Sequence, residues 1–176
     1  TFLVTGASGL IGYNLIKRLM QEKNVSIYAV GRSVSKLEQT FDEIADATNL
    51  HLCEYGHVIT HLDEFPKFDY IFHAAGPMEP EIVVNKPVDV IVPNIIDLHT
   101  ILEYAVHMKR GGHDCRVLIF SSVTVYQNNT NQDMSVSEND TDCGEALDKP
   151  KVSYSESKRM CEVLSKAYVK QYGIDV

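Results

Sequence analysis

The sequence has no tryptophan, few cysteines, no excess of positive charge and no long apolar run. Its 176 residues carry 24 acidic and 16 basic side chains, which gives a formal net charge of −8. This acidic balance argues against nucleic acid or an anionic membrane as the main partner. No stretch approaches the ~20 apolar residues that a transmembrane helix needs. Together with the lack of a signal-peptide pattern, these features lead us to expect a cytoplasmic protein.

The residues that commonly bind metals are few and poorly spaced for that purpose. No Cys-x-x-Cys pair occurs among the four cysteines, which are Cys53, Cys115, Cys143 and Cys161. They are therefore expected to be reduced packing residues rather than a disulfide framework. His51, His57 and His61 lie close together, but no carboxylate spacing beside them suggests a metal cage. We expect these histidines to be loop and surface residues, and we expect no metal site.

A glycine-rich turn lies near the beginning of the chain. Phe2-Leu3-Val4 suits a buried strand, and apolar residues recur at intervals of three and four after the turn. Glycines let the backbone approach a pyrophosphate, and a helix amino terminus offers free N–H groups to phosphates. A tight turn without a ligand is the alternative, but three glycines at intervals of three favour a dinucleotide site. The candidate cofactor contacts in this turn are Gly6, Ser8, Gly9, Leu10, Ile11 and Gly12.

Near the other end, the segment Tyr154-Ser155-Glu156-Ser157-Lys158 has the spacing of a proton-transfer pair. On a helix, residues four apart leave the same face one turn apart. An ammonium near a phenol favours the phenolate, which would let Tyr154 act as an acid or base near neutral pH. The spacing alone is weak evidence, since Tyr154 could be a packing residue and Lys158 a solvated one. The glycine turn makes the catalytic interpretation the stronger one.

These two motifs resemble the short-chain dehydrogenase/reductase superfamily, and Thr-Gly-Ala-x-Gly-x-Ile-Gly resembles its extended branch, the nucleotide-sugar epimerases and dehydratases. Residues 69–76 resemble the fourth strand of that family and its small-residue exit past the cofactor ribose. Residues 117–126 resemble the fifth strand, which ends in a catalytic hydroxyl and a Val-Tyr pair. The resemblance therefore covers essentially the whole chain, with the motifs in the order that the family has.

The resemblance implies a Rossmann-type doubly wound parallel sheet with helices on both faces, with residues 1–176 forming one NAD(P)-binding domain. We predict strands at 1–5, 25–31, 50–54, 68–74 and 116–121, and helices at 10–22, 33–46, 87–109 and 151–171. Pro93 would bend the third helix or mark a late start. The polar stretch 127–150 is a lid or a spacer, and its position favours a lid. Family members continue further, so we expect either a trimmed cofactor domain or an abbreviated relative, in which the C-terminal substrate lobe is absent.

By the same resemblance, three residues form the catalytic set: Ser122, Tyr154 and Lys158. Tyr154 would exchange a proton with a sugar hydroxyl or ketone, Ser122 would hydrogen-bond the same oxygen, and Lys158 would hold the ribose. Ser122 is favoured over Ser121 because it precedes Tyr126 by four residues, which is the family offset, although Ser122 could also be only a strand-end cap. The resemblance adds four cofactor-site residues, Ala74, Ala75, Gly76 and Asn94, and the catalytic Tyr154 and Lys158 also contact the cofactor.

The end of the second strand bears on which dinucleotide binds. NAD-binding relatives carry an acidic residue there that holds the adenosine ribose, whereas this chain has Gly31 followed by Arg32. A guanidinium could hold a 2′-phosphate, so we expect NADP to be favoured over NAD. The alternative is that Arg32 stacks on the adenine or faces solvent. The residue that contacts the adenine is unassigned.

The residues after Ser122 help to choose a reaction. Val123 and Thr124 stand where related 4,6-dehydratases carry Asp-Glu and decarboxylases keep a Glu. Without a carboxylate, loss of water is hard to support, so we expect an epimerase that transiently oxidises a carbon of a nucleotide-activated sugar. Residues 154–159 resemble the decarboxylase-like subgroup instead, and we give more weight to the missing acid.

Two other functions remain open. One is an NADP-dependent reductase of a keto-sugar or another carbonyl, which Arg32 would suit. The other is a non-catalytic dinucleotide-binding module, and we expect these 176 residues alone to bind dinucleotide weakly and to turn over no sugar. A homodimer through helices 87–109 and 151–171 is expected from the resemblance.

Overall fold

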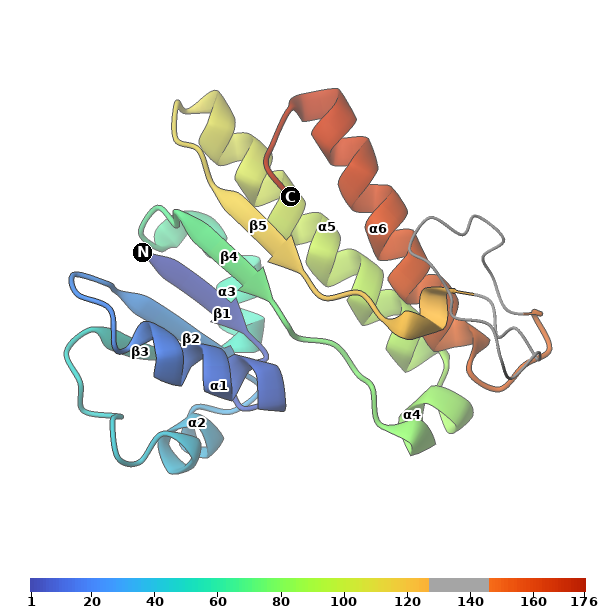
Figure 1. Ribbon diagram of the computed structural model, residues 1–176, viewed down its shortest axis with the longest axis horizontal. Coiled ribbons are helices and arrows are strands. Elements are labelled where there is room, and N and C mark those ends of the chain that lie inside the picture. Colours follow the sequence, from blue (N-terminus) through green and yellow to red (C-terminus); the bar gives the residue numbers. More distant parts are fainter. Residues whose placement is uncertain (127–145) are drawn as a thin grey trace, which may run out of the picture.

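The computed structural model describes residues 1–126 and 146–176, and its centre is a parallel β-sheet (Figure 1). In the described part of the chain the sheet has five strands, in the order β3-β2-β1-β4-β5. Their bounds are β1 (Phe2–Thr5), β2 (Ile27–Gly31), β3 (Leu50–Glu54), β4 (Tyr70–His73) and β5 (Arg116–Ile119). The order reverses beside β1, which pairs with both β2 and β4, and such switch points are where doubly wound sheets bind ligands. The predicted Rossmann-type fold is confirmed.

Helices cover both faces of this sheet (Figure 1). One face carries α1 (Leu10–Leu19) and α2 (Val34–Thr40), and the other carries α3 (Tyr55–Thr60), α5 (Val88–Arg110) and α6 (Val152–Tyr172). The remaining helical segments are η1 (Leu62–Glu64), α4 (Pro80–Asn85) and η2 (Val123–Val125). The glycine turn before α1, the segment leading to α4 and the segment leading to η2 all follow the carboxyl ends of strands.

The alternation of side chains along β1 divides the core into two layers. Leu3 packs in the layer that contains α5 and α6, whereas Val4 packs in the layer that contains α1 and α2. Both side chains are fully buried, and burying an aliphatic side chain of this size contributes about 1.5–3 kcal/mol. A strand buried on both faces fits the continuous apolar run that the sequence shows.

Small side chains hold α6 close to α5. They recur every four residues along the buried face of α6: Ser153, Ser157, Cys161 and Ser165. Short side chains at a helix contact let the two backbones approach each other, and α5 and α6 run side by side behind the sheet (Figure 1). The residues of α6 that lie next to this seam are therefore held in fixed positions against the sheet.

The structure corrects several element bounds. The first two helices end at Leu19 and Thr40, earlier than predicted, and α3 and α4 were not predicted at all, since six residues show little periodicity. α5 begins at Val88, before Pro93, so a late start is excluded. Most of the expected lid at 127–150, together with Cys143, lies outside the described residues.

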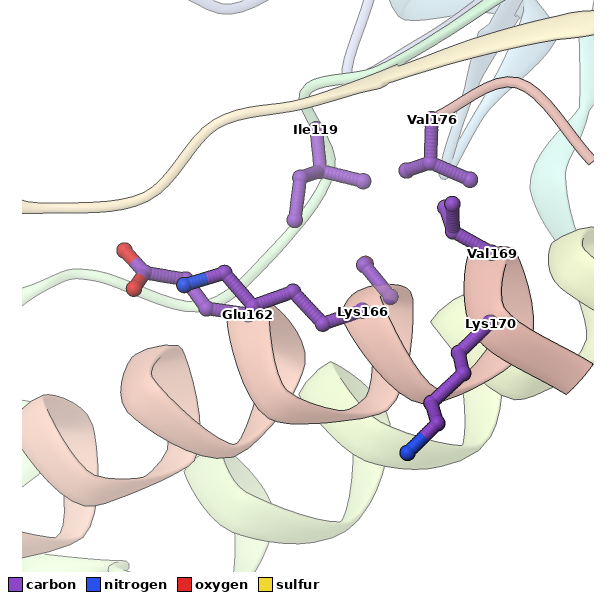
Figure 2. A pocket seen from close by; sticks show the side chains of 7 residues that line it. Ile119, Glu162, Lys166, Val169, Lys170 and Val176 are labelled. Carbon is purple, nitrogen blue, oxygen red and sulfur yellow. The ribbon is translucent and has the colours of Figure 1, made fainter.

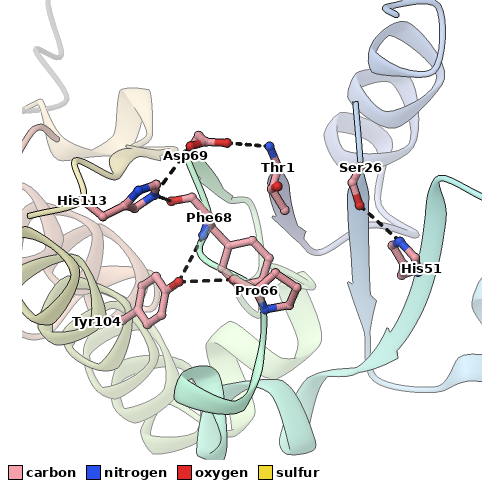
Figure 3. A network of polar contacts seen from close by, with 8 residues as sticks. All are labelled: Thr1, Ser26, His51, Pro66, Phe68, Asp69, Tyr104 and His113. Carbon is pink, nitrogen blue, oxygen red and sulfur yellow. Dashed lines mark hydrogen bonds and ion pairs between the residues drawn. The ribbon is translucent and has the colours of Figure 1, made fainter. Parts of the chain in front are cut away.

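Side chains close the amino-terminal edge of the sheet (Figure 3). Tyr104 Oη accepts a hydrogen bond from the Phe68 backbone nitrogen at 3.1 Å, and His113 Nε2 lies 3.1 Å from the Phe68 carbonyl oxygen. On the neighbouring strands, Ser26 Oγ lies 3.2 Å from His51 Nε2. His51 belongs to β3, so the expectation that it is a loop or surface residue is wrong. These contacts fix the loops at the amino-terminal edge, on the opposite side of the sheet from the glycine turn.

Candidate active site

The glycine turn is packed so closely that side chains would not fit at two of its positions. Gly6 has a φ of +68°, and a methyl group on it would lie 2.6 Å from the Ala74 carbonyl oxygen. A methyl group on Gly12 would lie 2.4 Å from the Gly6 carbonyl oxygen. The Gly9 nitrogen donates to that same oxygen at 2.9 Å, which closes the turn. The sequence needs glycine here because backbone occupies the space of a side chain.

The amino terminus of α1 suits an anion. Its N-cap residue, Gly9, provides no side-chain hydrogen bond, and its first turn contains no acidic residue. The first N–H groups of a helix have no partner within the helix, and its dipole places positive charge there. Leu10 and Ile11 are exposed at this end, and Ser8 is half-buried beside them. The predicted cofactor residues of the turn thus form a cradle that fits a pyrophosphate, with no competing carboxylate.

A buried polar link joins the ends of β1 and β4 beside the cradle. Thr5 Oγ1 lies 2.9 Å from His73 Nδ1 and accepts a hydrogen bond from the Ala75 nitrogen at 3.1 Å. His73 is 7% exposed, and burial, followed by the charge of Lys158, lowers its pKa to about 3. The imidazole is therefore neutral near pH 7. Sequence reasoning missed this link, although both residues end strands that it predicted.

Residues 74–76 connect the cradle to the catalytic helix. Ala74 packs against Gly6 at one end of this short segment. At the other end, a methyl group on Gly76 would lie 2.7 Å from Asn94 Oδ1 and 3.8 Å from Lys158 Nζ. The glycine turn and Lys158, from opposite ends of the sequence, therefore lie on either side of residues 74–76.

Asn94 is buried between α5 and α6. Its Nδ2 donates to Ser157 Oγ at 3.0 Å, and its backbone carbonyl accepts a hydrogen bond from Cys161 Sγ at 3.4 Å. The asparagine is 3% exposed, and its amide oxygen is directed at Gly76. It therefore packs behind the site rather than on its open surface.

Lys158 and Tyr154 lie on α6, as the spacing predicted. Lys158 Nζ donates to the Phe120 carbonyl oxygen at 2.9 Å, just beyond β5, and burial lowers the pKa of the ammonium group. Tyr154 lies in the first turn of α6 and is half-buried. Because the two residues are four apart in this helix, their side chains leave the same face.

The two neighbouring serines after β5 have different partners. Ser121 Oγ donates to Glu162 Oε1 on α6, one turn beyond Lys158. Ser122 is the N-cap of η2, and its Oγ accepts hydrogen bonds from the backbone nitrogen and the hydroxyl of Thr124, at 3.2 and 2.9 Å. Since η2 packs against α6, Ser122 lies next to the helix that carries Tyr154 and Lys158. Ser122 therefore caps the start of η2 rather than the end of a strand, and capping leaves its hydroxyl proton available.

Arg32 lies at the open edge of the site, after β2. It is 84% exposed, and its Nη2 lies 3.7 Å from Glu79 Oε1 at the start of α4. Backbone N–H groups of Glu79 and Met78, followed by Arg32, lower the pKa of Glu79, which keeps its carboxylate ionised. Sequence reasoning missed this carboxylate, because it looked for an acid only at the end of β2. A phosphate at Arg32 would therefore meet a negative charge that competes for the guanidinium.

A hollow elsewhere on the surface contains none of the candidate site residues. It lies between the end of β5, α6 and the last residues of the chain (Figure 2). Its lining consists of Ile119, Glu162, Ser165, Lys166, Val169, Lys170 and Val176.

The described residues contain no group of three or more His, Cys, Asp or Glu that could hold a metal ion. Within the same described ranges, no helix combines the length and apolar character needed to cross a membrane.

The parallel sheet, with a glycine cradle at its switch point, defines a dinucleotide-binding Rossmann domain. Residues 2–176 match the NAD dependent epimerase/dehydratase family, and the chain belongs to that family.

Individual relatives are distant. The chain is 27% identical over 176 residues to UDP-glucuronic acid decarboxylase 1 of Danio rerio, covering 99% of this chain and 39% of that protein. It is 28% identical over 188 residues to UDP-glucuronic acid decarboxylase 6 of Arabidopsis thaliana, covering 99% of this chain and 48% of the relative. The chain thus spans less than half the length of these curated relatives.

Solved structures share the fold. Pal from Bacillus thuringiensis superposes with a TM-score of 0.78 at 24% identity, covering 98% of this chain and 53% of that one. UDP-glucuronic acid 4-epimerase from Bacillus cereus, solved in complex with NAD, gives a TM-score of 0.73 at 21% identity, with the same coverage. These likenesses establish the architecture of the chain.

Proposed function

We propose that the chain is the dinucleotide-binding part of an epimerase that acts on a nucleotide-activated sugar. The single observation that carries this proposal is the series of close contacts that links Gly6 to Lys158 through residues 74–76. It supports one continuous site, with a phosphate cradle at one end and a lysine-tyrosine pair at the other. Membership of the NAD dependent epimerase/dehydratase family agrees with such a site.

Each catalytic residue has a distinct task in this proposal. Tyr154 takes the proton of the sugar hydroxyl and later returns it, because it is the phenol nearest to Lys158 along the helix. The Lys158 ammonium supplies positive charge on the same helix face, and its hydrogen bond to the Phe120 carbonyl oxygen holds it in place. Ser122 donates a hydrogen bond to the sugar oxygen. When bound, the nicotinamide supplies hydride exchange with the sugar carbon.

The two residues after Ser122 favour an epimerase over a dehydratase. The side chain of Val123 is 85% exposed and apolar, and the Thr124 hydroxyl is engaged with Ser122, so neither residue provides an acid for removing water. A decarboxylase is the rival that the curated relatives suggest by name. Epimerisation requires only that the oxidised sugar rotate to turn its other face toward the same cofactor, which needs no further acid or base.

Product analysis tests the proposal. The full-length protein would be incubated with UDP-glucuronic acid and, separately, with UDP-glucose, and the products would be identified by NMR. We expect the 4-epimer, without release of carbon dioxide, loss of water or net change in cofactor redox state. Carbon dioxide release would instead identify a decarboxylase, and stoichiometric NADPH consumption a reductase. Dinucleotide binding without turnover of any sugar would indicate a non-catalytic module.

We propose that NADP is preferred over NAD, but by a narrow margin. The exposed Arg32 side chain can reach a 2′-phosphate. The Glu79 carboxylate, whose Oε1 lies 3.7 Å from Arg32 Nη2, would repel that phosphate. An exposed ion pair is worth about 0.2–1 kcal/mol, so either effect changes affinity by less than about tenfold. Fluorescence titration with NADPH and NADH measures the preference, and equal affinities would contradict it.

We also propose that residues 1–176 act as one domain that dimerises through α5 and α6. Exposed apolar side chains recur at intervals of three and four on both helices: Val88, Val92, Ile96, Met160 and Val163. Such a surface suits a second copy of the same two helices. Light scattering measures the oligomeric state. We expect the wild-type protein to be a dimer that V92E weakens. A monomeric wild-type protein whose mass V92E leaves unchanged would contradict the proposal.

A further inference from the structure

Thr124 makes two hydrogen bonds to the candidate catalytic hydroxyl. Its backbone nitrogen donates to Ser122 Oγ at 3.2 Å, and its own hydroxyl donates to the same atom at 2.9 Å. A serine oxygen has two lone pairs and a single proton. Both acceptor positions of Ser122 are therefore occupied by a single neighbouring residue.

The consequence is that Ser122 has only its proton to offer. Within residues 1–126 and 146–176, no group accepts a hydrogen bond from the Ser122 hydroxyl. The residue is half-buried next to α6, so its proton has a preferred direction rather than free rotation. A carboxylate at position 124 could not do this, because an ionised carboxylate has no proton to donate.

We propose that Thr124 is a positioning residue that makes Ser122 a one-way hydrogen-bond donor to the reacting sugar oxygen. This inference rests on the proposed epimerase function. As a donor, Ser122 stabilises negative charge on the sugar oxygen as Tyr154 removes its proton, and it cannot compete with Tyr154 for that proton. Thr124 itself touches neither the substrate nor the cofactor in this arrangement.

The side chains around Thr124 provide matched variants. Thr124→Val has nearly the same shape and keeps the backbone donor, but it removes the hydroxyl donor. Thr124→Ser restores that donor on a smaller side chain. Val123→Ala is the control, since Val123 is 85% exposed and lies between the two residues. Each would be made in the full-length protein and measured with UDP-glucuronic acid, or with UDP-glucose if that is the better substrate.

We expect T124V to lower kcat about fivefold to tenfold, the effect of one neutral hydrogen bond, with KM within about twofold of wild type. T124S should recover most of the loss, and V123A should be within about twofold of wild type. Ser122→Ala should lower kcat about 100-fold or more, because the donor itself is lost. Affinity for NADPH should not change in any of these variants.

A double-mutant cycle separates positioning from a purely structural role. If Thr124 acts through Ser122, adding T124V to S122A causes no further loss of kcat. Losses that multiply, or a T124V enzyme as fast as wild type, would overturn the inference while leaving the epimerase intact. Wild-type protein that turns over neither sugar, or S122A with full activity, would overturn the proposed function and the inference together.

Discussion

Replacing the glycines of the cradle one at a time should separate backbone strain from steric overlap. Gly6→Ala has both problems, since it needs a φ of +68° and brings its methyl group 2.6 Å from a backbone oxygen. Gly12→Ala has only the overlap, at 2.4 Å. Gly112→Ala has only the strain, with a φ of +76° and no atom within 4 Å, and Gly56→Ala has neither.

The sizes of these effects can be worked out from general values. A left-handed conformation costs an alanine about 1–2 kcal/mol, and overpacking costs about 1–3 kcal/mol. We therefore expect the free energy of unfolding to fall by about 2–5 kcal/mol for G6A, about 2 for G12A and about 1–2 for G112A. G56A, in helix α3, should gain up to about 1 kcal/mol. Urea unfolding measures all four, and each kcal/mol changes Tm by roughly 2–4 °C in a chain of this size.

Dinucleotide binding provides the second readout for the same set. G6A and G12A should weaken NADPH binding, because moving this turn moves the N–H groups that hold the pyrophosphate. G112A should bind like wild type despite its lower stability, since Gly112 follows α5 at the opposite edge of the sheet. The absence of tryptophan from these residues leaves cofactor fluorescence free of that background. A G12A protein that binds NADPH as tightly as G112A does would refute the link between the turn and the pyrophosphate.

Two further predictions concern charged groups near the cradle. Because burial depresses the pKa of His73 to about 3, the unfolded chain binds more protons than the folded one between pH 6.5 and 3, so stability should fall with acidification across that window. From pH 6.5 to 4.5 the free energy of unfolding, measured with urea, should fall by about 2–3 kcal/mol because of this group. His73→Asn should flatten this dependence on pH, whereas the control His107→Asn, at an exposed position, should not. Parallel curves for H73N and wild type would contradict the assignment to His73. Arg32→Ala should weaken NADPH binding up to about fivefold without affecting NADH, and Glu79→Gln should strengthen NADPH binding by a similar factor; an R32A protein with unchanged affinity for NADPH would remove Arg32 from the site.

The fold could be read from the sequence because its signals are local and repeated. Most of the strands are short and mainly apolar, and the glycine turn falls between β1 and α1 in the order that a dinucleotide site requires. The helices that were missed, α3 and α4, have only six residues each, too few for a periodic pattern. The end of α2 was overestimated because apolar residues continue at helical spacing beyond Thr40, at Phe41 and Ile44.

The site was only partly predictable, because its decisive contacts join residues far apart in the chain. The motifs located Gly6, Lys158 and residues 74–76, but they did not show that this segment packs against Gly6 at one end and lies beside Lys158 at the other. The partner of Arg32 is Glu79, which lies at the start of a helix that the pattern did not show. The Thr124–Ser122 hydrogen bonds are local, but a hydroxyl two residues away does not show from its spacing alone whether it contacts Ser122.

The central claim is that Tyr154, supported by Lys158, removes a proton from a sugar held beside the nicotinamide. Its most direct test is rapid mixing of the NAD(P)⁺-loaded full-length protein with UDP-glucuronic acid or UDP-glucose, monitored by nicotinamide absorbance. Wild-type protein should show transient reduction, and Tyr154→Phe should slow it about 100-fold or more while binding cofactor normally. Reduction at the same rate in both proteins would contradict the account.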